Sequence, residues 1–272
     1  MDNAIKDMFK KYNVNSFDDE VNAIREIIQE IILCGLSRCG FFDEAVLIGE
    51  TASRLYYKLD RFSKDLNFIL LAPSEYFIAH KYLDFMAREL NAYGIDVEFM
   101  TKDDNQRYVL KFIPKAFLGI NSNIFNEIRL KFDIDTTSQN LGIYEFKFKA
   151  LPSSHKIRVF DEQSILNDII ADILSQKSNY KVSGRILYDF AYYVNKGVKI
   201  TLYSIEDKLI ENSIISEDES LKIDDIILML EKKFNRINYD NAKKDVSTLT
   251  KINLDFWNEE YFSKLTKDLV EE

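Results

Sequence analysis

The stretch from Ala45 to Leu71 constrains the fold more than any other part of the chain. A hydrophobic run ends at Gly49, a polar turn and a short helical pattern follow, and Asp65 opens a second hydrophobic run. This order predicts a strand, a turn, a helix and a second strand. Side chains two positions apart on a strand point to the same face, so we expect Asp65 and Asn67 to project together.

These residues suggest a particular chemistry. Carboxylate and amide oxygens are ligands that Mg²⁺ accepts in proteins, and a glycine turn allows backbone amides to face an anion. The helix expected after Gly49 adds an N-terminus that favours phosphate, with Thr51 as its predicted cap. The combination points to magnesium-dependent nucleotidyl transfer. The glycine by itself is more typical of an ordinary turn than of a phosphate site.

Composition narrows the class of protein. The chain has 272 residues with 46% hydrophobic content, enough for one large domain or two ordinary ones. No apolar run approaches the ~20 residues of a membrane span, and the first residues lack the hydrophobic core of a signal peptide. Cys34 and Cys39 match neither a redox pair nor a zinc knuckle. We therefore expect free thiols in a cytoplasmic protein with no membrane partner.

The net charge of −9 opposes long-range attraction of nucleic acid. Any RNA contact therefore needs a local basic patch. Lys147, Lys149, Lys156 and Arg158, which flank one loop, are candidates for such a patch. A solvated charged surface explains the same cluster.

Periodicity along the chain predicts the order of elements. Helical spacing over 16–36 is followed by a strand at 45–48, a helix at 51–58, a strand at 67–71 and a helix from Ser74 to Tyr93. Alternation then predicts strands at 95–100, 108–113, 124–134, 144–149 and 156–160. Beyond Phe160 the pattern is helical at 161–175, 183–194, 202–212, 221–234, 239–250 and 259–269.

This order indicates an α+β protein in which helices flank a mixed β-sheet and a C-terminal helical bundle follows. We expect a first domain over 1–160 and a helical domain over 161–272, with no true linker between them.

Several motifs resemble the nucleotidyltransferase domain of AbiEii-type toxins, within the DNA polymerase β-like nucleotidyltransferase superfamily. The stretch 49–51 is similar to the family's Gly-Gly-Thr turn, and 61–68 is similar to its Arg-x-Ser-x-Asp-x-Asp motif. The segments 129–134, 184–190 and 256–262 resemble the family's acid-ending strand, its Gly-Arg-Asp-x-Tyr-Asp helix and its tail. The resemblance covers most of the chain in the same order.

The resemblance implies roles for individual residues. Asp65, Asn67 and Asp133 would hold Mg²⁺ and, with Asp189, form the catalytic set. The implied nucleotide-binding residues are Gly49, Glu50, Thr51, Arg61, Ser63, Lys131 and Arg185. Arg61 and Ser63 either contact phosphate or brace the second strand. Arg185 and Asp189 are four residues apart, which is also the spacing of a simple pair on one helical face.

The chain departs from the family pattern at four positions. Glu50 replaces a glycine, and Asn67 and Ile186 each replace an aspartate. Ile169 stands where the family has a lysine that pairs with the aspartate corresponding to Asp189. These changes remove charge from a metal site and a cation from the triphosphate site.

Two hypotheses follow. The chain is a divergent nucleotidyltransferase that transfers a nucleoside monophosphate from a nucleoside triphosphate to RNA, such as tRNA, or to a protein. The resemblance then implies the toxin of a toxin–antitoxin or phage-defence system, with a cognate antitoxin as partner. Alternatively, it is a catalytically inactive relative that binds nucleotide, RNA or a protein partner. A helical interaction protein with a purely structural sheet is a third option.

Overall fold

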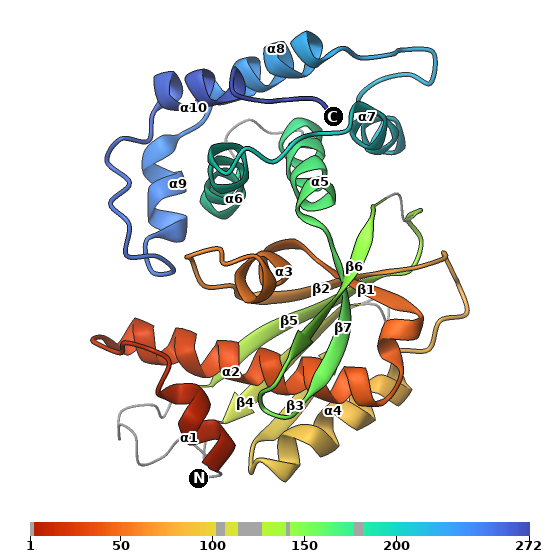
Figure 1. Cartoon of the computed structure of the whole chain (residues 1–272), viewed down its shortest axis with the longest axis vertical. Helices are drawn as coiled ribbons and strands as arrows, with labels where there is room; N and C mark the ends of the chain where they lie inside the picture. The colour runs from red at the N-terminus through yellow and green to blue at the C-terminus, as the bar shows by residue number, and fades with distance from the viewer. Residues whose placement is uncertain (1–2, 102–106, 114–126, 140–141, 177–181) are drawn as a thin grey trace. The chain divides into compact units, whose positions relative to one another are not determined.

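The computed structural model describes residues 3–101, 107–113, 127–139, 142–176 and 182–272 (Figure 1). The chain divides into two compact units. The sheet unit comprises Met1–Tyr56, Phe62–Asn140 and Tyr144–Val159. The helical unit comprises Tyr57–Arg61, Leu141–Ile143 and Phe160–Glu272. Two short segments that precede Phe160 in the chain therefore belong to the helical unit.

The strands described in the sheet unit form one mixed sheet. They are β1 (Ala45–Ile48), β2 (Asp65–Leu70), β3 (Asp96–Thr101), β4 (Arg107–Ile113), β5 (Ile128–Asp135), β6 (Tyr144–Lys149) and β7 (His155–Phe160). Their order across the sheet is β3-β4-β5-β2-β1-β7-β6. The pairs β2–β5 and β1–β7 are parallel, whereas β1–β2, β3–β4 and β4–β5 are antiparallel. The expected mixed sheet is thus confirmed. Residues 124–126 of the predicted fifth strand lie outside the described residues.

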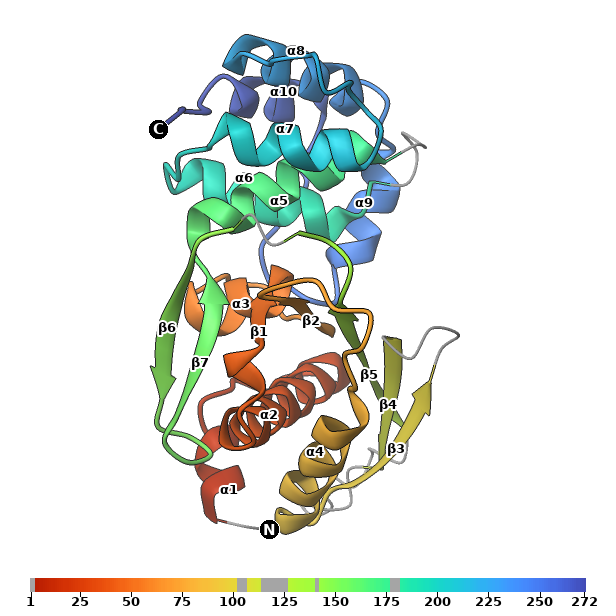
Figure 2. The ribbon, with the colours of Figure 1, turned by 90° about the vertical axis from the view of Figure 1, so that its right-hand side faces the viewer.

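The helices of the sheet unit are α1 (Asn3–Phe9), α2 (Phe17–Arg38), α3 (Gly49–Tyr56) and α4 (His80–Ala92), with a short 3₁₀ helix at Phe41–Asp43. Helices α2 and α4 lie against each other, and α4 also lies against β3 (Figure 2). The prediction that Ser74 opens α4 is wrong. Its backbone N–H donates to the carbonyl of Thr136 at 2.8 Å, which ties this segment to the end of β5.

Aromatic side chains fill the core beneath one face of the sheet. The rings of Phe68 on β2 and Phe132 on β5 lie 5.1 Å apart. Phe41 contacts Phe68 and Tyr82 edge to face, at 4.9 and 4.8 Å between ring centroids. Because strand side chains alternate, burial of Phe68 turns Asp65 and Asn67 to the opposite face.

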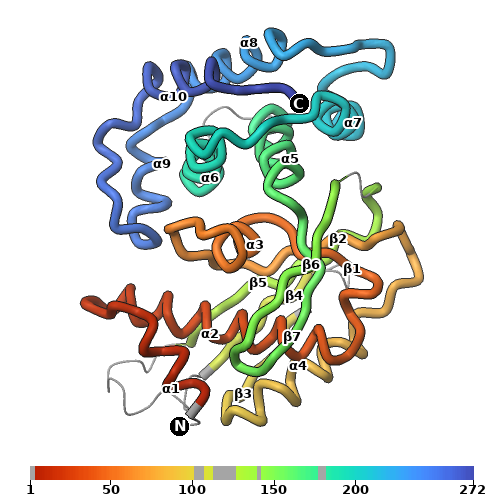
Figure 3. Tube along the Cα trace, in the orientation of Figure 1, coloured from red at the N-terminus to blue at the C-terminus, as the bar shows by residue number. Residues whose placement is uncertain are grey.

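The helical unit contains α5 (Glu162–Ser175), α6 (Gly184–Asn195), α7 (Leu202–Glu211), α8 (Ile223–Phe234), α9 (Tyr239–Val246) and α10 (Glu259–Thr266). Figure 3 follows this succession along the trace. Helix α5 packs against α6, α7 and α8, and α6 also packs against α9 and α10. The rings of Phe190, Phe234 and Phe262 form a continuous core, with centroids 5.4 and 5.3 Å apart. The expected C-terminal helical bundle is confirmed.

Two other expectations can be compared with the structure. Both Cys34 and Cys39 are free thiols, as expected. Among the helices that the structure describes, none has the length and apolar character needed to cross a membrane.

Gly184, the first residue of α6, is required by helix packing. A Cβ added at this position would lie 1.8 Å from the carbonyl oxygen of Ala242 on α9. That oxygen belongs to the backbone of a packed helix and cannot move freely. The contact explains why a glycine opens the 184–190 motif, independently of any chemistry.

We predict that Gly184→Ala destabilises the protein by about 1–3 kcal/mol, the usual cost of overpacking. Helix propensity alone predicts the opposite sign, a gain for alanine of less than the roughly 1 kcal/mol found in helix interiors, because Gly184 is the first helical residue. The sign of the change in urea-induced unfolding therefore decides between the two effects. An unchanged or raised midpoint would contradict the close packing of α6 on α9.

Candidate functional site

The pairing of β2 with β5 gathers the predicted metal-binding residues of the sheet unit. In this parallel pair Asn67 is opposite Asp133, and Asp65 is opposite Lys131. Paired residues on neighbouring strands project from the same face of a sheet. Asp65, Asn67, Lys131 and Asp133 therefore form one polar patch, on the face opposite the aromatic core.

Adjacent strands extend this patch on both sides. On β1, Ile48 is opposite Asn67, and Gly49 follows it directly. A Cβ added to Gly49 would lie 3.6 Å from Nδ2 of Asn67, so the turn is next to the patch. Gly49 has φ of 71°, a conformation that favours glycine. On β4, Arg107 is opposite Asp133 and adds a positive charge beside it.

A buried hydrogen-bond network holds the start of β2. Thr51 and Ser63 are 1% and 2% exposed, and their hydroxyl oxygens lie 2.7 Å apart. The Thr51 hydroxyl also donates to the backbone carbonyl of Asp65. Gln29 of α2 reaches the same carbonyl at 3.4 Å. The two hydroxyls therefore brace the strand, and a direct contact of either with a nucleotide stays a prediction.

The expected cap role of Thr51 is wrong. Helix α3 begins at Gly49, so Thr51 lies within its first turn. Its side chain points toward the start of β2 rather than back to its own helix, because the Asp65 carbonyl accepts its hydrogen bond.

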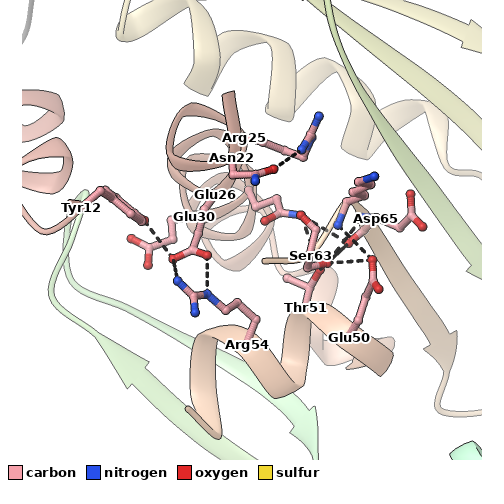
Figure 4. Close-up of polar contacts among 12 residues, drawn as sticks. Tyr12, Asn22, Arg25, Glu26, Glu30, Glu50, Thr51, Arg54, Ser63 and Asp65 are labelled. Carbon is pink, nitrogen blue, oxygen red and sulfur yellow. Dashed lines mark hydrogen bonds and ion pairs between the residues drawn. The ribbon is translucent and has the colours of Figure 1, made fainter. Parts of the chain in front are cut away.

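Glu50 is held by the segment that precedes β2 (Figure 4). Its Oε1 atom accepts hydrogen bonds from the backbone N–H of Lys64 at 2.9 Å and from the Ser63 hydroxyl at 3.1 Å. Glu50 thus places a carboxylate on a backbone amide at the turn, where the resemblance implies triphosphate binding.

Arg25 is a candidate functional residue that sequence reasoning missed. It lies on α2, where its Nη1 donates to Asn22 at 2.9 Å, while its buried Nε has no hydrogen-bond partner. Burial lowers the pKa of Arg25, and the carboxylates of Asp65 and Glu50 act in the opposite direction. A half-buried guanidinium thus lies within the electrostatic reach of the patch (Figure 4).

The sequence contained only a weak indication that Arg25 is a functional residue. A helical pattern marks the apolar face of α2 and treats the polar positions as surface. In the structure Asn22, Glu26 and Gln29 are also buried on this helix. Only the packing of α2 against the rest of the unit shows that this polar stripe is internal.

The oxygen ligands of the patch supply part of what one magnesium ion requires. Asp65 and Asp133 offer carboxylates and Asn67 offers an amide oxygen, all of which are hard oxygen ligands. Within the described ranges, no group of three or more His, Cys, Asp or Glu side chains is arranged to hold a metal ion. The protein's share of a site would therefore be two charges and one neutral oxygen, and substrate phosphates and water would complete it.

Asp189 and Arg61 belong to the helical unit, where they form a buried ion pair. Arg61 Nε and Nη2 donate to the two carboxylate oxygens of Asp189 at 2.7 and 2.6 Å. The side chains are 1% and 7% exposed. Ile169, which the motif resemblance aligns with a lysine, is buried in the same unit. Arg61 thus supplies the cation for Asp189. The predicted Arg185 lies half-buried in the first turn of α6.

A cavity of about 430 Å³ lies in the helical unit. Its walls are largely aromatic and include Tyr192, Trp257 and Tyr261, and Asp60 and Lys196 contribute charge. Tyr188 donates to Asp60 at 2.6 Å at its edge, and burial raises the pKa of this tyrosine. Such walls suit a flat apolar or aromatic group.

Comparison with solved structures shows which fold this is. The chain superimposes on MenT4, a nucleotidyltransferase toxin of Mycobacterium tuberculosis H37Rv, with a TM-score of 0.57 and 13% identity, covering 96% of this chain and 92% of that one. The chain has the nucleotidyltransferase fold. JHP933 from Helicobacter pylori matches with a TM-score of 0.48 and 18% identity, over 91% of this chain and 89% of that one. No family model matches the chain, and no curated protein matches it. The resemblance to AbiEii-type toxins in particular stays a prediction.

We predict that Asp189→Asn destabilises the protein by about 3–5 kcal/mol, because it removes the charge that Asp189 pairs with the buried Arg61 guanidinium. The double variant Arg61→Met with Asp189→Leu should recover most of this loss, since it buries no charge. Urea unfolding measures both.

The exposed pair of Lys10 and Asp7 serves as a control, with side chains 75% and 59% exposed. Lys10→Met should change stability by less than about 1 kcal/mol. If Asp189→Asn were as mild as this control, the buried pair would not hold the helical unit together.

Proposed function

We propose that the chain is a divergent magnesium-dependent nucleotidyltransferase that transfers a nucleoside monophosphate from a nucleoside triphosphate to an acceptor hydroxyl. One observation carries the proposal. The β2–β5 register places Asp65, Asn67 and Asp133 on one sheet face beside the Gly49 turn, in a chain with the nucleotidyltransferase fold.

The proposed reaction requires charge neutralisation and positioning. The acceptor oxygen forms a bond to the α-phosphorus, the bond to the pyrophosphate oxygen breaks, and the acceptor's proton is released. When bound, Mg²⁺ would neutralise the triphosphate and polarise its oxygens. Asp65 and Asp133 would hold it through carboxylate oxygens and Asn67 through its amide carbonyl. Arg25, Lys131 and Arg107 would supply positive charge for the phosphates.

The biological role we propose is that of a toxin. MenT4 is a nucleotidyltransferase toxin, and the motif resemblance also points to toxins of toxin–antitoxin or phage-defence systems. An RNA such as tRNA, or a protein, would be the acceptor, and a cognate antitoxin would be a partner. Toxicity on expression, lost in an Asp65→Ala variant, is the expected phenotype.

A catalytically inactive relative that binds nucleotide, RNA or a protein partner is the second candidate. It is favoured by Glu50, whose carboxylate holds the Lys64 amide, and by the amide of Asn67 in place of a charged ligand. Under this alternative the native chain binds magnesium poorly. The double variant Glu50→Gly with Asn67→Asp should then bind magnesium more tightly, which calorimetry measures directly.

We predict that Asp65→Ala and Asp133→Ala each reduce nucleotidyl transfer by about a hundredfold or more, because each removes a group that stabilises transition-state charge. The assay supplies the four labelled triphosphates in turn with a pool of tRNA. Asp43→Ala, at an exposed position, is the matched control and should retain activity. Absence of transfer with every triphosphate, together with absence of magnesium-dependent triphosphate binding, would refute the proposal.

We also predict that Arg25→Gln raises the KM for the triphosphate by about tenfold or more, which is the loss expected for one charge-assisted hydrogen bond. Initial rates measured against triphosphate concentration give this value. Arg236→Gln, which changes an exposed arginine, should leave KM unchanged. An unchanged KM for Arg25→Gln would show that this guanidinium has only a structural role.

A further inference from the structure

The edge strand β6 exposes a row of aromatic rings. Strand β6 ends the sheet order, and Figure 2 shows it running opposite to β7. Tyr144, Phe146 and Phe148 alternate along one side of it and are 40%, 44% and 73% exposed. Natural edge strands are normally protected by charges or covered by other elements. Three large rings exposed side by side therefore need an explanation.

The opposite side of β6 has an ordinary structural role. Lys147 pairs with Glu145 at 2.8 Å, and Lys149 pairs with the buried Glu30 of α2. These two lysines are neutralised by neighbouring carboxylates. Only part of the basic cluster noted in the sequence therefore remains for binding an anion.

The remaining cations lie over the exposed rings. Lys156 Nζ on β7 is 4.2 Å from the ring centroid of Phe146. The guanidinium carbon of Arg158 is 4.8 Å from the Tyr144 centroid and 5.1 Å from the Phe146 centroid. Neither cation forms an ion pair with any described residue. The buried Nε and Nη1 of Arg158 also have no hydrogen-bond partner.

We propose that this aromatic–basic surface, made of Tyr144, Phe146, Phe148, Lys156 and Arg158, binds single-stranded RNA. Aromatic rings offer stacking positions to unpaired bases, and the two cations offer charge to the phosphates.

Charge complementarity favours single-stranded RNA over a second copy of the chain as the molecule that binds this surface. A second copy of the chain at this edge would bring the same unpaired cations against each other. A polyanion that carries flat apolar groups matches both the positive charge and the exposed rings of this surface. Duplex RNA satisfies only the charge requirement, since its bases are already stacked. The strand geometry spaces successive rings by about 6.7 Å, which leaves room for bases separated from one another.

The acceptor of the proposed transfer would then be an RNA with an unpaired segment. This last step rests on the proposed function, whereas RNA binding by the surface does not. Failure of the transfer assay with intact RNA binding would remove only the proposed function. Loss of binding with intact transfer to a protein would remove only this inference.

The test is fluorescence anisotropy of a labelled, unstructured single-stranded RNA with the full chain at low salt. Phe146→Ala and Phe148→Ala should each weaken binding by about tenfold, the loss typical of one stacked base. Arg158→Gln should weaken binding and reduce the slope of log affinity against log salt by about 0.7. Thermal melting checks that each variant is folded.

Helix α4 offers a matched control. Arg88 lies 5.1 Å from the ring centroid of Phe85, an exposed aromatic, so this pair has the same chemistry on a different surface. Phe85→Ala and Arg88→Gln should leave RNA affinity unchanged. The proposal is overturned if these controls weaken binding as much as the β6–β7 variants, or if duplex RNA binds equally well. Sedimentation that shows a dimer dissociated by Phe148→Ala would overturn it in favour of a second copy.

Discussion

The parallel pairing of β2 with β5 is the constraint on which the candidate site depends. Side chains on a strand alternate between two faces, so a register shift of one residue would exchange the core face for the polar face. The contact of Phe68 with Phe132 in the aromatic core opposes such a shift. The same contact places Asn67 opposite Asp133 on the other face. Hydrophobic packing thus determines the arrangement of the polar side chains.

The start of β2 is held just as firmly, and by polar contacts. Thr51 and Ser63 are buried against the Asp65 carbonyl, and Glu50 accepts hydrogen bonds from the segment before the strand. Residues that a motif comparison assigns to a ligand can therefore also support the backbone. In this protein the motif from 61 to 68 has both kinds of residue. Ser63 braces β2, Arg61 supports the helical unit through Asp189, and Asp65 lies in the polar patch.

The departures from the AbiEii-type pattern that the motifs resemble have different physical consequences. Ile169 stands where that pattern has a lysine, yet Asp189 accepts two hydrogen bonds from Arg61. Asn67 retains an oxygen in the patch and loses a charge, which weakens the attraction for a hard cation. Glu50 adds a negative charge at the turn, and its carboxylate is stabilised by a hydrogen bond from the Lys64 backbone N–H. In the proposed metal site, these contacts would leave more of the coordination to substrate phosphates and water.

The sequence by itself determined the alternation of β2, the order of strands and helices, and the polar face of β5, because these follow from local periodicity. It did not determine which strands are neighbours, nor that α4 begins at His80 after a segment tied to Thr136. Arg25, the pairing of Arg61 with Asp189, and the cations over the rings of β6 were decided only by the tertiary structure. Each depends on burial or on contact between residues distant along the chain. Local patterns carry no information about such contacts, because a half-buried arginine and a solvated one have the same neighbours in sequence.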